Sequence, residues 1–171
     1  CRDEVVVMGA VLALHSSSDV LGVAVRWLDS GPGADEVRAF PLGRDLSNQL
    51  LSCVEQVLPA HQWPQLTRLA VATGPGGFTG TRLTLVLART LAQQLAIPLH
   101  GFSSFLLIAR RLAAPAGAMA GAERFWLTQE LPRRGVVAGA YGPDAAAFGG
   151  VAEWEPPRLF PRGEALPEGP R

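Results

Sequence analysis

The feature that most limits how this chain can fold is a glycine-rich turn at 73–82, Thr-Gly-Pro-Gly-Gly-Phe-Thr-Gly-Thr-Arg. It lies between an apolar run at 66–73 and a helical pattern that begins near Thr81. Its glycines allow positive φ angles and a close approach of the backbone to another chain or a ligand. The simplest interpretation is a tight strand-to-helix turn capped by Thr79 or Thr81. Backbone N–H groups at such a turn also favour anions, and the weak anion-site candidates are Gly76, Gly77, Thr79 and Gly80.

Two known phosphate-binding motifs do not fit this turn. A P-loop that starts at Gly74 requires a glycine where Thr79 stands, followed by a lysine. The chain has no lysine, because all 15 basic residues are arginine. A dinucleotide fingerprint that starts at Gly74 and Gly76 also requires its third glycine at Thr79, and Gly80 comes one residue too late.

Alternating strand and helix patterns surround the turn. Strands are expected at 10–15, 20–28 and 36–42, with turns at 16–19 and at Asp29–Asp35 between them. Asp45 is a plausible N-cap of a helix that runs to Leu58 before Pro59. The expected elements that follow are a strand at 66–73, a helix to Ala96, a strand at Leu99–Gly101 and a helix capped by Ser103 that runs to about Ala114. The order β-β-β-α-β-α-β-α predicts a sheet with helices on its faces.

The pattern weakens after residue 114, so we expect an N-terminal lobe at 1–114 and a shortened second lobe with an irregular tail at 115–171. Two strands are expected in the second lobe, at 124–129 and 135–141, and the tail from 143 onward is rich in Pro, Gly and Ala. Residues 1–9 are expected to be extra N-terminal residues. Met8 directly precedes the first strand and is the expected natural start, which would make residues 1–7 dispensable.

The composition is that of a globular protein, with 48% hydrophobic residues, 18% charged residues and a net charge of zero. The absence of lysine excludes lysine-based catalysis, and the balanced charge argues against autonomous binding of nucleic acid. Two cysteines, Cys1 and Cys53, make no disulfide framework and suit a cytoplasmic protein. No membrane span is expected, since no apolar run is long enough.

Three segments resemble the signatures of the TsaB (YeaZ) family. Residues 73–83 are similar to the pattern Gly-Pro-Gly-Ser-Phe-Thr-Gly-(Leu/Val)-Arg-Ile, with Gly77 in place of Ser and Thr81 in place of Leu or Val. Residues 12–18 resemble the opening Leu-Ala-Ile-Asp-Thr-Ser-Thr, and residues 97–104 resemble Pro-x-x-Gly-Val-Ser-(Ser/Thr). All three occur in the family's order, and the glycine signature is the most specific of them.

The resemblance implies an α/β fold of the actin/sugar-kinase-like (ASKHA) type, in which a ribonuclease-H-like lobe has a mixed sheet with flanking helices. It also implies a non-catalytic subunit that dimerises with TsaD in the cytoplasm. The pair would support formation of N6-threonylcarbamoyladenosine at position 37 of tRNAs reading codons beginning with A. A TsaE-type ATPase is a further expected partner, and tRNA would be bound only through the complex. No cofactor is expected for the chain alone, and ATP or ADP would enter only within the TsaD/TsaE complex.

Catalytic groups of the fold are hard to find in this chain. The carboxylate that usually holds hydrated Mg²⁺ at the end of the first strand is replaced by His15, and Asp19 is a poor substitute. The histidines His15, His61 and His100 have no metal-site spacing, and Ser16–Ser18 suggest no triad. We therefore expect neither catalysis nor a metal site. A small ASKHA-type phosphotransferase or a glycoprotease-like hydrolase stays open as the alternative.

Two helices carry more apolar residues than one buried face requires. On the second helix, Thr84, Ala88, Leu91, Ala92 and Leu95 form the stripe expected to face the sheet. By resemblance, the interface with TsaD is expected to include Leu50, Val54, Leu83, Val86, Leu87 and Thr90. When the partner is absent, the same helices would serve a homodimer.

Overall fold

The computed structural model describes residues 9–28, 35–147 and 149–171. Met8, the expected start, and most of the turn expected at Asp29–Asp35 lie outside these residues. The chain divides into two compact units, Cys1–Phe102 and Ser103–Arg171. The helix that follows Ser103 is therefore grouped with unit 2, whereas the boundary expected at 114/115 assigned it to the first lobe.

Unit 1 is built on a five-stranded mixed sheet in the order β3-β2-β1-β4-β5. Its strands are β1 (Ala10–His15), β2 (Val20–Trp27), β3 (Glu36–Pro41), β4 (Leu66–Ala72) and β5 (Leu99–Phe102). The first three strands pair in antiparallel fashion, and β1, β4 and β5 pair in parallel. Parallel neighbours need a crossover connection, and helices supply it. The short helix η1 (Gly43–Asp45), α1 (Leu46–Val57) and η2 (Ala60–Gln65) precede β4, and α2 (Phe78–Leu95) precedes β5.

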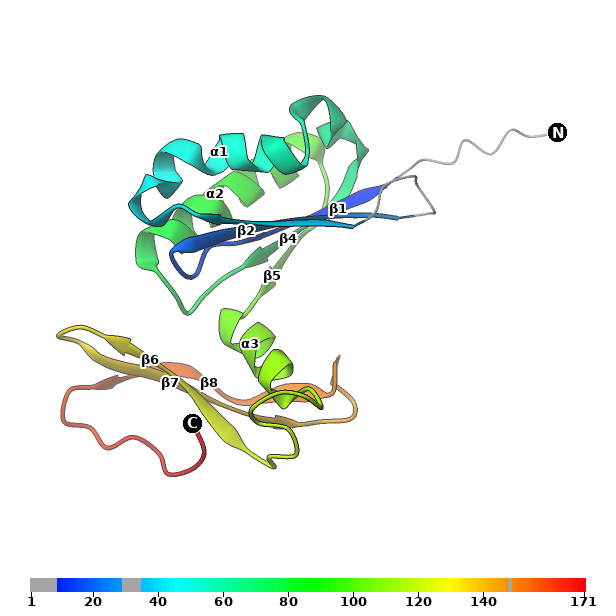
Figure 1. The fold of residues 1–171 in the computed structure, drawn as a ribbon. Coiled ribbons are helices and arrows are strands. Elements are labelled where there is room, and N and C mark those ends of the chain that lie inside the picture. Colours follow the sequence, from blue (N-terminus) through cyan, green and yellow to red (C-terminus); the bar gives the residue numbers. More distant parts are fainter. Residues whose placement is uncertain (1–8, 29–34, 148) are drawn as a thin grey trace. The chain divides into compact units, whose positions relative to one another are not determined.

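The core of unit 1 lies between this sheet and its two long helices. Figure 1 shows α1 and α2 on the same face of the sheet. Burial alternates along β1 and β2, as expected for strands with one covered face. The predicted sheet-facing stripe of α2 is confirmed, because Thr84 and Ala88 are fully buried and Leu91 is 4% exposed. Cys53 is also buried and free, and burial raises the pKa of its thiol.

The helix starts differ from the expected ones at two places. Asp45 does occupy the N-cap position of α1, but its side chain makes no capping hydrogen bond. Helix α2 begins at Phe78 after Gly77, so neither Thr79 nor Thr81 caps it. The glycine turn leads straight into the helix, where the Thr81 N–H already donates to the Gly77 carbonyl (3.0 Å).

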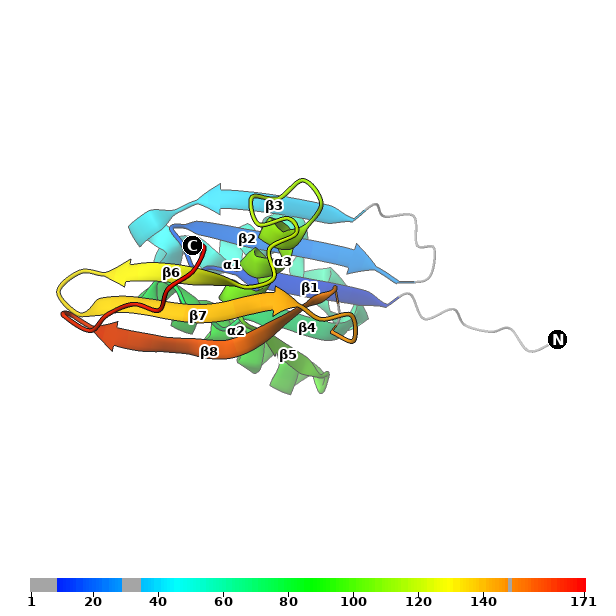
Figure 2. The ribbon, with the colours of Figure 1, turned by 90° about the horizontal axis from the view of Figure 1, so that it is seen from below.

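Unit 2 contains α3 (Ser104–Ala113) and the three-stranded antiparallel sheet β6 (Phe125–Leu131), β7 (Gly135–Pro143) and β8 (Val151–Pro161). Ser103 caps α3 as predicted, since its hydroxyl accepts from the Leu106 N–H (3.3 Å). Figure 2 shows the three strands side by side. Among the residues that the structure describes, no helix is long and apolar enough to cross a membrane.

Both faces of the second sheet are covered. On one face, Phe105 of α3 packs in a cluster with Phe125 and Tyr141. On the other face, Trp126 and Phe160 form a cluster against which Leu166 of the C-terminal segment packs. The Trp126 N–H donates to the carbonyl of Pro170 (2.8 Å), which holds this segment beside β6.

The expectation of an irregular tail from residue 143 is wrong, because β8 spans eleven residues of it. The adjacent Pro156 and Pro157 hide the strand in the sequence. Proline is tolerated at a sheet edge and near bulges, and β8 is an edge strand whose pairing with β7 shifts register between Ala138 and Ala140. After β8, the chain from 162 onward has no regular element.

Candidate functional site

The glycine-rich turn is held between two neighbouring segments of unit 1. Both the N–H and the hydroxyl of Thr73 donate to the Phe102 carbonyl at the end of β5, at 2.8 and 3.1 Å. On its other side, the Gly77 N–H donates to the Ser17 carbonyl in the β1–β2 turn (2.8 Å). The turn therefore joins the ends of strands that are distant in the sequence.

Two glycines of the turn lie close to neighbouring atoms, and the approach at Gly76 leaves no room for a side chain. A Cβ atom at Gly76 would lie 2.3 Å from both the Cβ atom and the carbonyl oxygen of Ser17. A Cβ atom at Gly80 would lie 3.0 Å from the Ser16 carbonyl oxygen and from Leu46 Cδ2. The space beside Gly76 is thus filled by the chain itself. These glycines support packing of the β1–β2 turn against the start of α2.

A buried hydroxyl pair strengthens the same contact. The Ser16 side chain, 1% exposed, donates to the Gly80 carbonyl (2.9 Å), and its oxygen lies 2.5 Å from the hydroxyl oxygen of Thr84. Burying a hydroxyl is tolerated when it is hydrogen-bonded. The serine-rich run after β1 therefore has a structural role at its first residue.

A pocket of about 340 Å³ lies beside this contact. Three of the four anion-site candidates, Gly77, Thr79 and Gly80, line it, and Gly76 does not. Its charged lining residues are one acid, Asp19, and one base, Arg44. Because their formal charges cancel, charge alone does not favour an anion over a neutral ligand here.

The histidines occupy three separate places. His15 ends β1, and burial lowers the pKa of its imidazole, which favours the neutral form. The Ser17 N–H approaches its Nδ1 atom at 3.5 Å. His61 and His100 are both exposed. Within the described ranges, no group of three His, Cys, Asp or Glu side chains is placed to hold a metal ion.

An exposed apolar surface lies on the helical layer of unit 1. Val86 of α2 is 63% exposed, and Leu51 of α1 is 49% exposed. Thr90 is exposed one turn after Val86, and its hydroxyl donates back to the Val86 carbonyl (2.9 Å). The half-buried Leu83 and Leu87 flank Val86 and also pack against the core. We call these five residues the α-layer surface: Leu51, Leu83, Val86, Leu87 and Thr90.

Two residues expected in the partner interface lie elsewhere. Leu50 is 7% exposed and Val54 is fully buried, so both are part of the unit's own core. They share a four-residue spacing with Leu46, and that stripe faces the sheet side of α1. Leu51 lies off the stripe, and this position was the signal that would have identified it as the exposed leucine.

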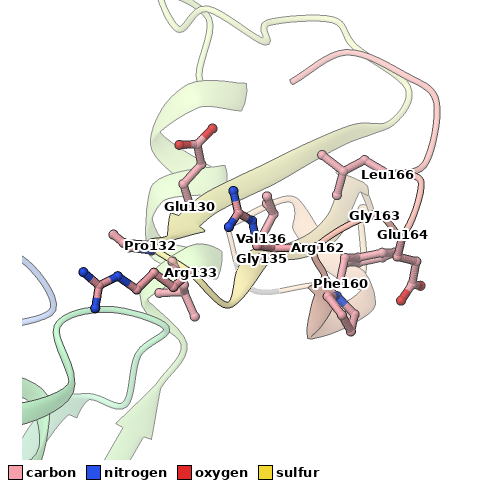
Figure 3. Close-up of a pocket in the computed structure, with 12 residues that line it drawn as sticks. Glu130, Pro132, Arg133, Gly135, Val136, Phe160, Arg162, Gly163, Glu164 and Leu166 are labelled. Atoms are coloured by element: carbon pink, nitrogen blue, oxygen red, sulfur yellow. The ribbon is translucent and has the colours of Figure 1, made fainter.

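A second pocket, of about 460 Å³, lies within unit 2 at one end of its sheet. The β6–β7 turn and the residues after β8 line it, and Figure 3 shows Arg133 and Arg162 among them. Sequence reasoning did not single out this place. Arg133 stands in a segment that the sequence predicts to be a turn, and Arg162 stands in the segment expected to be an irregular tail.

The first unit defines the class of the protein. A mixed sheet in the order β3-β2-β1-β4-β5, with its first three strands antiparallel, is the arrangement of a ribonuclease-H-like lobe. Two structures of YeaZ-type proteins from Pseudomonas aeruginosa share the fold. One is titled "YeaZ from Pseudomonas aeruginosa" and the other an uncharacterized protein with similarity to peptidase YeaZ. Their TM-scores are 0.72 and 0.73, each is 24% identical, and the matches cover 95% of this chain and 72% and 71% of theirs.

Sequence comparisons find similarity to proteins named for the formation of threonylcarbamoyladenosine in tRNA. Residues 42–119 match the family described as "TsaD: tRNA N6-adenosine threonylcarbamoyltransferase". The tRNA threonylcarbamoyladenosine biosynthesis protein TsaB of Bacillus subtilis is 32% identical over 108 residues, which is 58% of this chain. Together with the shared YeaZ fold, these matches make the chain similar to proteins of the TsaB (YeaZ) family. The match spans 43% of the length of the Bacillus subtilis relative.

Proposed function

We propose that this chain is a non-catalytic subunit that binds a TsaD-type protein and supports formation of N6-threonylcarbamoyladenosine in tRNA. The name of the Bacillus subtilis relative and the family matched by residues 42–119 support the pathway. The observation that carries the subunit role is the α-layer surface, centred on Val86 at 63% exposure. The proposal extends to position 37 of tRNAs that read codons beginning with A, to a TsaE-type ATPase as a third component, and to the cytoplasm.

An exposed valine on a long helix is a reasonable centre for a helix–helix contact. Val86 stands mid-helix in α2, an 18-residue element whose opposite stripe is fixed to the sheet. Burial of apolar surface contributes about 25 cal/mol per Å², but association must also overcome several kcal/mol of lost freedom. Val86 alone is therefore insufficient, and the proposal requires Leu83, Leu87 and Leu51 to be buried along with it.

The chemistry of the β1 end supports the non-catalytic part of the proposal. The imidazole of His15 is held towards its neutral form at the place where a carboxylate is expected. A neutral imidazole is a poor ligand for a hard cation such as Mg²⁺, which prefers oxygen donors. In this proposal the metal, the nucleotide and the transfer chemistry belong to the partner.

A matched pair of valine substitutions tests the interface. Val86→Asp places a charge in the proposed contact, whereas Val37→Asp places one on the edge strand β3, where Val37 is 74% exposed. We expect Val86→Asp to abolish co-purification with a TsaD-type protein and Val37→Asp to preserve it. Retention of the partner by folded Val86→Asp would remove the α-layer surface from the proposal.

Two measurements separate the alternatives. A phosphotransferase of the same fold would bind ATP on its own, so calorimetric titration of the isolated chain with MgATP is expected to show no heat of binding. Self-association through the α-layer surface would give a dimer mass in light scattering that disappears when the TsaD-type protein is added. Persistence of that dimer beside a full complement of partner would place the partner contact elsewhere.

A further inference from the structure

Three arginines gather at one end of the sheet of unit 2. Arg133 and Arg134 lie in the turn between β6 and β7, and Arg162 directly follows β8. Gly135 pairs with Pro161 across the β7–β8 ladder, so the turn and the end of β8 meet at the same edge. Arg133 and Arg162 are among the residues that line the pocket of about 460 Å³ at this edge, and Figure 3 shows the Arg133 side chain extending away from the others. We call Arg133, Arg134 and Arg162 the arginine cluster.

The arginine cluster carries uncompensated charge. All three side chains are exposed, and within the described part of the chain they take part in no ion pair. Of the two carboxylates that line the pocket, Glu164 already pairs with Arg158 (3.0 Å), whereas Glu130 makes no such pair. Three guanidinium charges minus one carboxylate leave a local formal charge of +2 in a chain whose net charge is zero.

The backbone holds an arginine at this turn in a conformation that arginine rarely adopts. Arg133 has a φ of 67° and follows Pro132, while the Arg134 N–H donates to the Leu131 carbonyl (3.0 Å). This is the third position of a tight turn that normally takes glycine or asparagine. Arg133 makes no ion pair with any described residue, so no such contact offsets the strain. Such strain is commonly retained where a side chain is needed for function.

The pocket has polar edges but no open aromatic surface. Phe160 lines it but is only 3% exposed, and the Arg158 guanidinium lies 3.5 Å above its ring centre. A nucleobase therefore finds no ring face on which to stack, whereas two arginines, Arg133 and Arg162, line the pocket and can bind phosphate oxygens. Guanidinium forks match phosphate geometry and contribute to binding by releasing counterions from a polyanion.

We propose that the arginine cluster binds the phosphodiester backbone of the tRNA within the assembled complex. This inference rests on the proposed function, because it takes the tRNA and the TsaD-type partner from it. The three contacts are too few for the isolated chain to bind RNA by itself, since each exposed phosphate contact contributes modestly and is screened by salt. Within a complex that already holds the tRNA, they add to a contact made mainly by the partner.

The test measures tRNA binding by the assembled complex over a range of KCl concentrations. The variant Arg133→Gln/Arg134→Gln/Arg162→Gln is compared with Arg26→Gln/Arg68→Gln/Arg111→Gln, which removes the same charge from other exposed positions. We expect the cluster variant to raise Kd by roughly tenfold at low salt and to reduce the slope of log Kd against log salt by about 2. The control triple and the lysine variant Arg133→Lys/Arg134→Lys/Arg162→Lys should both keep most of the wild-type slope of log Kd against log salt.

Complex formation is measured first, by mass, for every variant. Failure of the wild-type chain to form the complex would refute the proposed function, independently of the arginine cluster. An intact complex whose salt slope is the same with and without the cluster would overturn the present inference alone. So would calorimetric binding of AMP to the isolated chain that is lost in the cluster variant, because the site would then serve a mononucleotide.

Discussion

The two units of this chain form their buried cores with different kinds of side chain. In the part that the structure describes, the hydrophobic core cluster of unit 1 consists of aliphatic residues and Cys53, and the aromatic residues that pack against it are only partly buried. In unit 2, aromatic residues dominate the buried clusters: Phe105, Phe125, Trp126, Tyr141 and Phe160. A large aromatic side chain buries as much surface as several small residues. Unit 2 therefore depends on a few anchors, whereas unit 1 spreads its stability over many contacts.

Close approaches of the backbone to glycine occur in both units. In unit 1, the β1–β2 turn touches the glycine-rich turn directly at Gly76 and Gly80. In unit 2, backbone also approaches glycine closely: a Cβ atom would lie 2.0 Å from the Leu112 carbonyl oxygen at Gly117 and 2.0 Å from the Phe160 carbonyl oxygen at Gly135. Added atoms at such glycines are therefore costly in both units, and what distinguishes unit 2 is its sensitivity to the loss of a buried aromatic anchor.

The largest effect is expected at Gly76. Gly76→Ala places a Cβ atom 2.3 Å from the Ser17 backbone, so the β1–β2 turn must separate from α2. We expect a loss of about 3 kcal/mol or more in the free energy of unfolding, measured by urea denaturation. Gly77→Ala is the matched control, because its Cβ atom would lie 3.8 Å from the Ser17 carbonyl oxygen and should change stability by less than about 1 kcal/mol. Equal stability of the two variants would contradict the close backbone contact.

In unit 2, a comparable loss should follow from removing one tryptophan. Trp126 is 3% exposed and lies under Leu166, whereas Trp154 is 48% exposed. Trp126→Ala should cost about 3–4 kcal/mol, as expected for a fully buried aromatic residue. Trp154→Ala should cost about 1 kcal/mol, since roughly half of its surface is already in water. If the costs of the two substitutions were similar, unit 2 would not depend on its buried anchors.

A smaller effect is expected at Tyr141. Its hydroxyl donates to Glu153 (3.1 Å), and burial followed by the charge of Glu153 raises the pKa of the phenol above its usual value near 10. A pKa raised on folding gives stability that is present below about pH 10 and is lost as the pH rises above it. Tyr141 is the chain's one tyrosine, so absorbance at 295 nm reports this phenol alone.

We therefore expect the phenolate signal to appear together with unfolding above pH 10, rather than before it. Tyr141→Phe should lower stability by about 1 kcal/mol at pH 7 through the lost hydrogen bond. The same variant should lose less stability than the wild type between pH 10 and 11. A phenolate signal near pH 10 in a chain whose circular dichroism is still native would show that the raised pKa is wrong.

The sequence predicted unit 1 more fully than unit 2 because periodicity is informative where a core is aliphatic and regular. The strands on either side of Ser16 and the sheet-facing stripe of α2 follow directly from it. The same periodicity led to the expectation that Leu50 and Val54 belong to the partner interface. Both are buried instead, since a regular stripe marks the face that packs on the chain's own sheet. In unit 2, Pro156 and Pro157 made β8 unrecognisable in the sequence. The spacing of residues also gives no sign that Arg162 and Arg133 lie at the same end of one sheet.

Only part of the role of the glycine-rich turn could be predicted from the sequence. Positive φ angles and close approach were expected, and Gly74 does have a φ of 95°. The sequence does not say that the approaching group at Gly76 is Ser17, since that contact depends on the pairing of β1 with β4. The usual serine of the TsaB family at position 77 also fits, because a Cβ atom there has room.

Formation of N6-threonylcarbamoyladenosine in a reconstituted reaction tests the central claim most directly. The chain is combined with a TsaD-type protein, a TsaE-type ATPase, threonylcarbamoyl-adenylate and tRNA, and each component is also omitted in turn. The account predicts no product from the chain alone, product from the full set, a nearly complete loss with Val86→Asp and wild-type yield with Val37→Asp. Product formed by the chain without the TsaD-type protein, or wild-type yield with Val86→Asp, would contradict it.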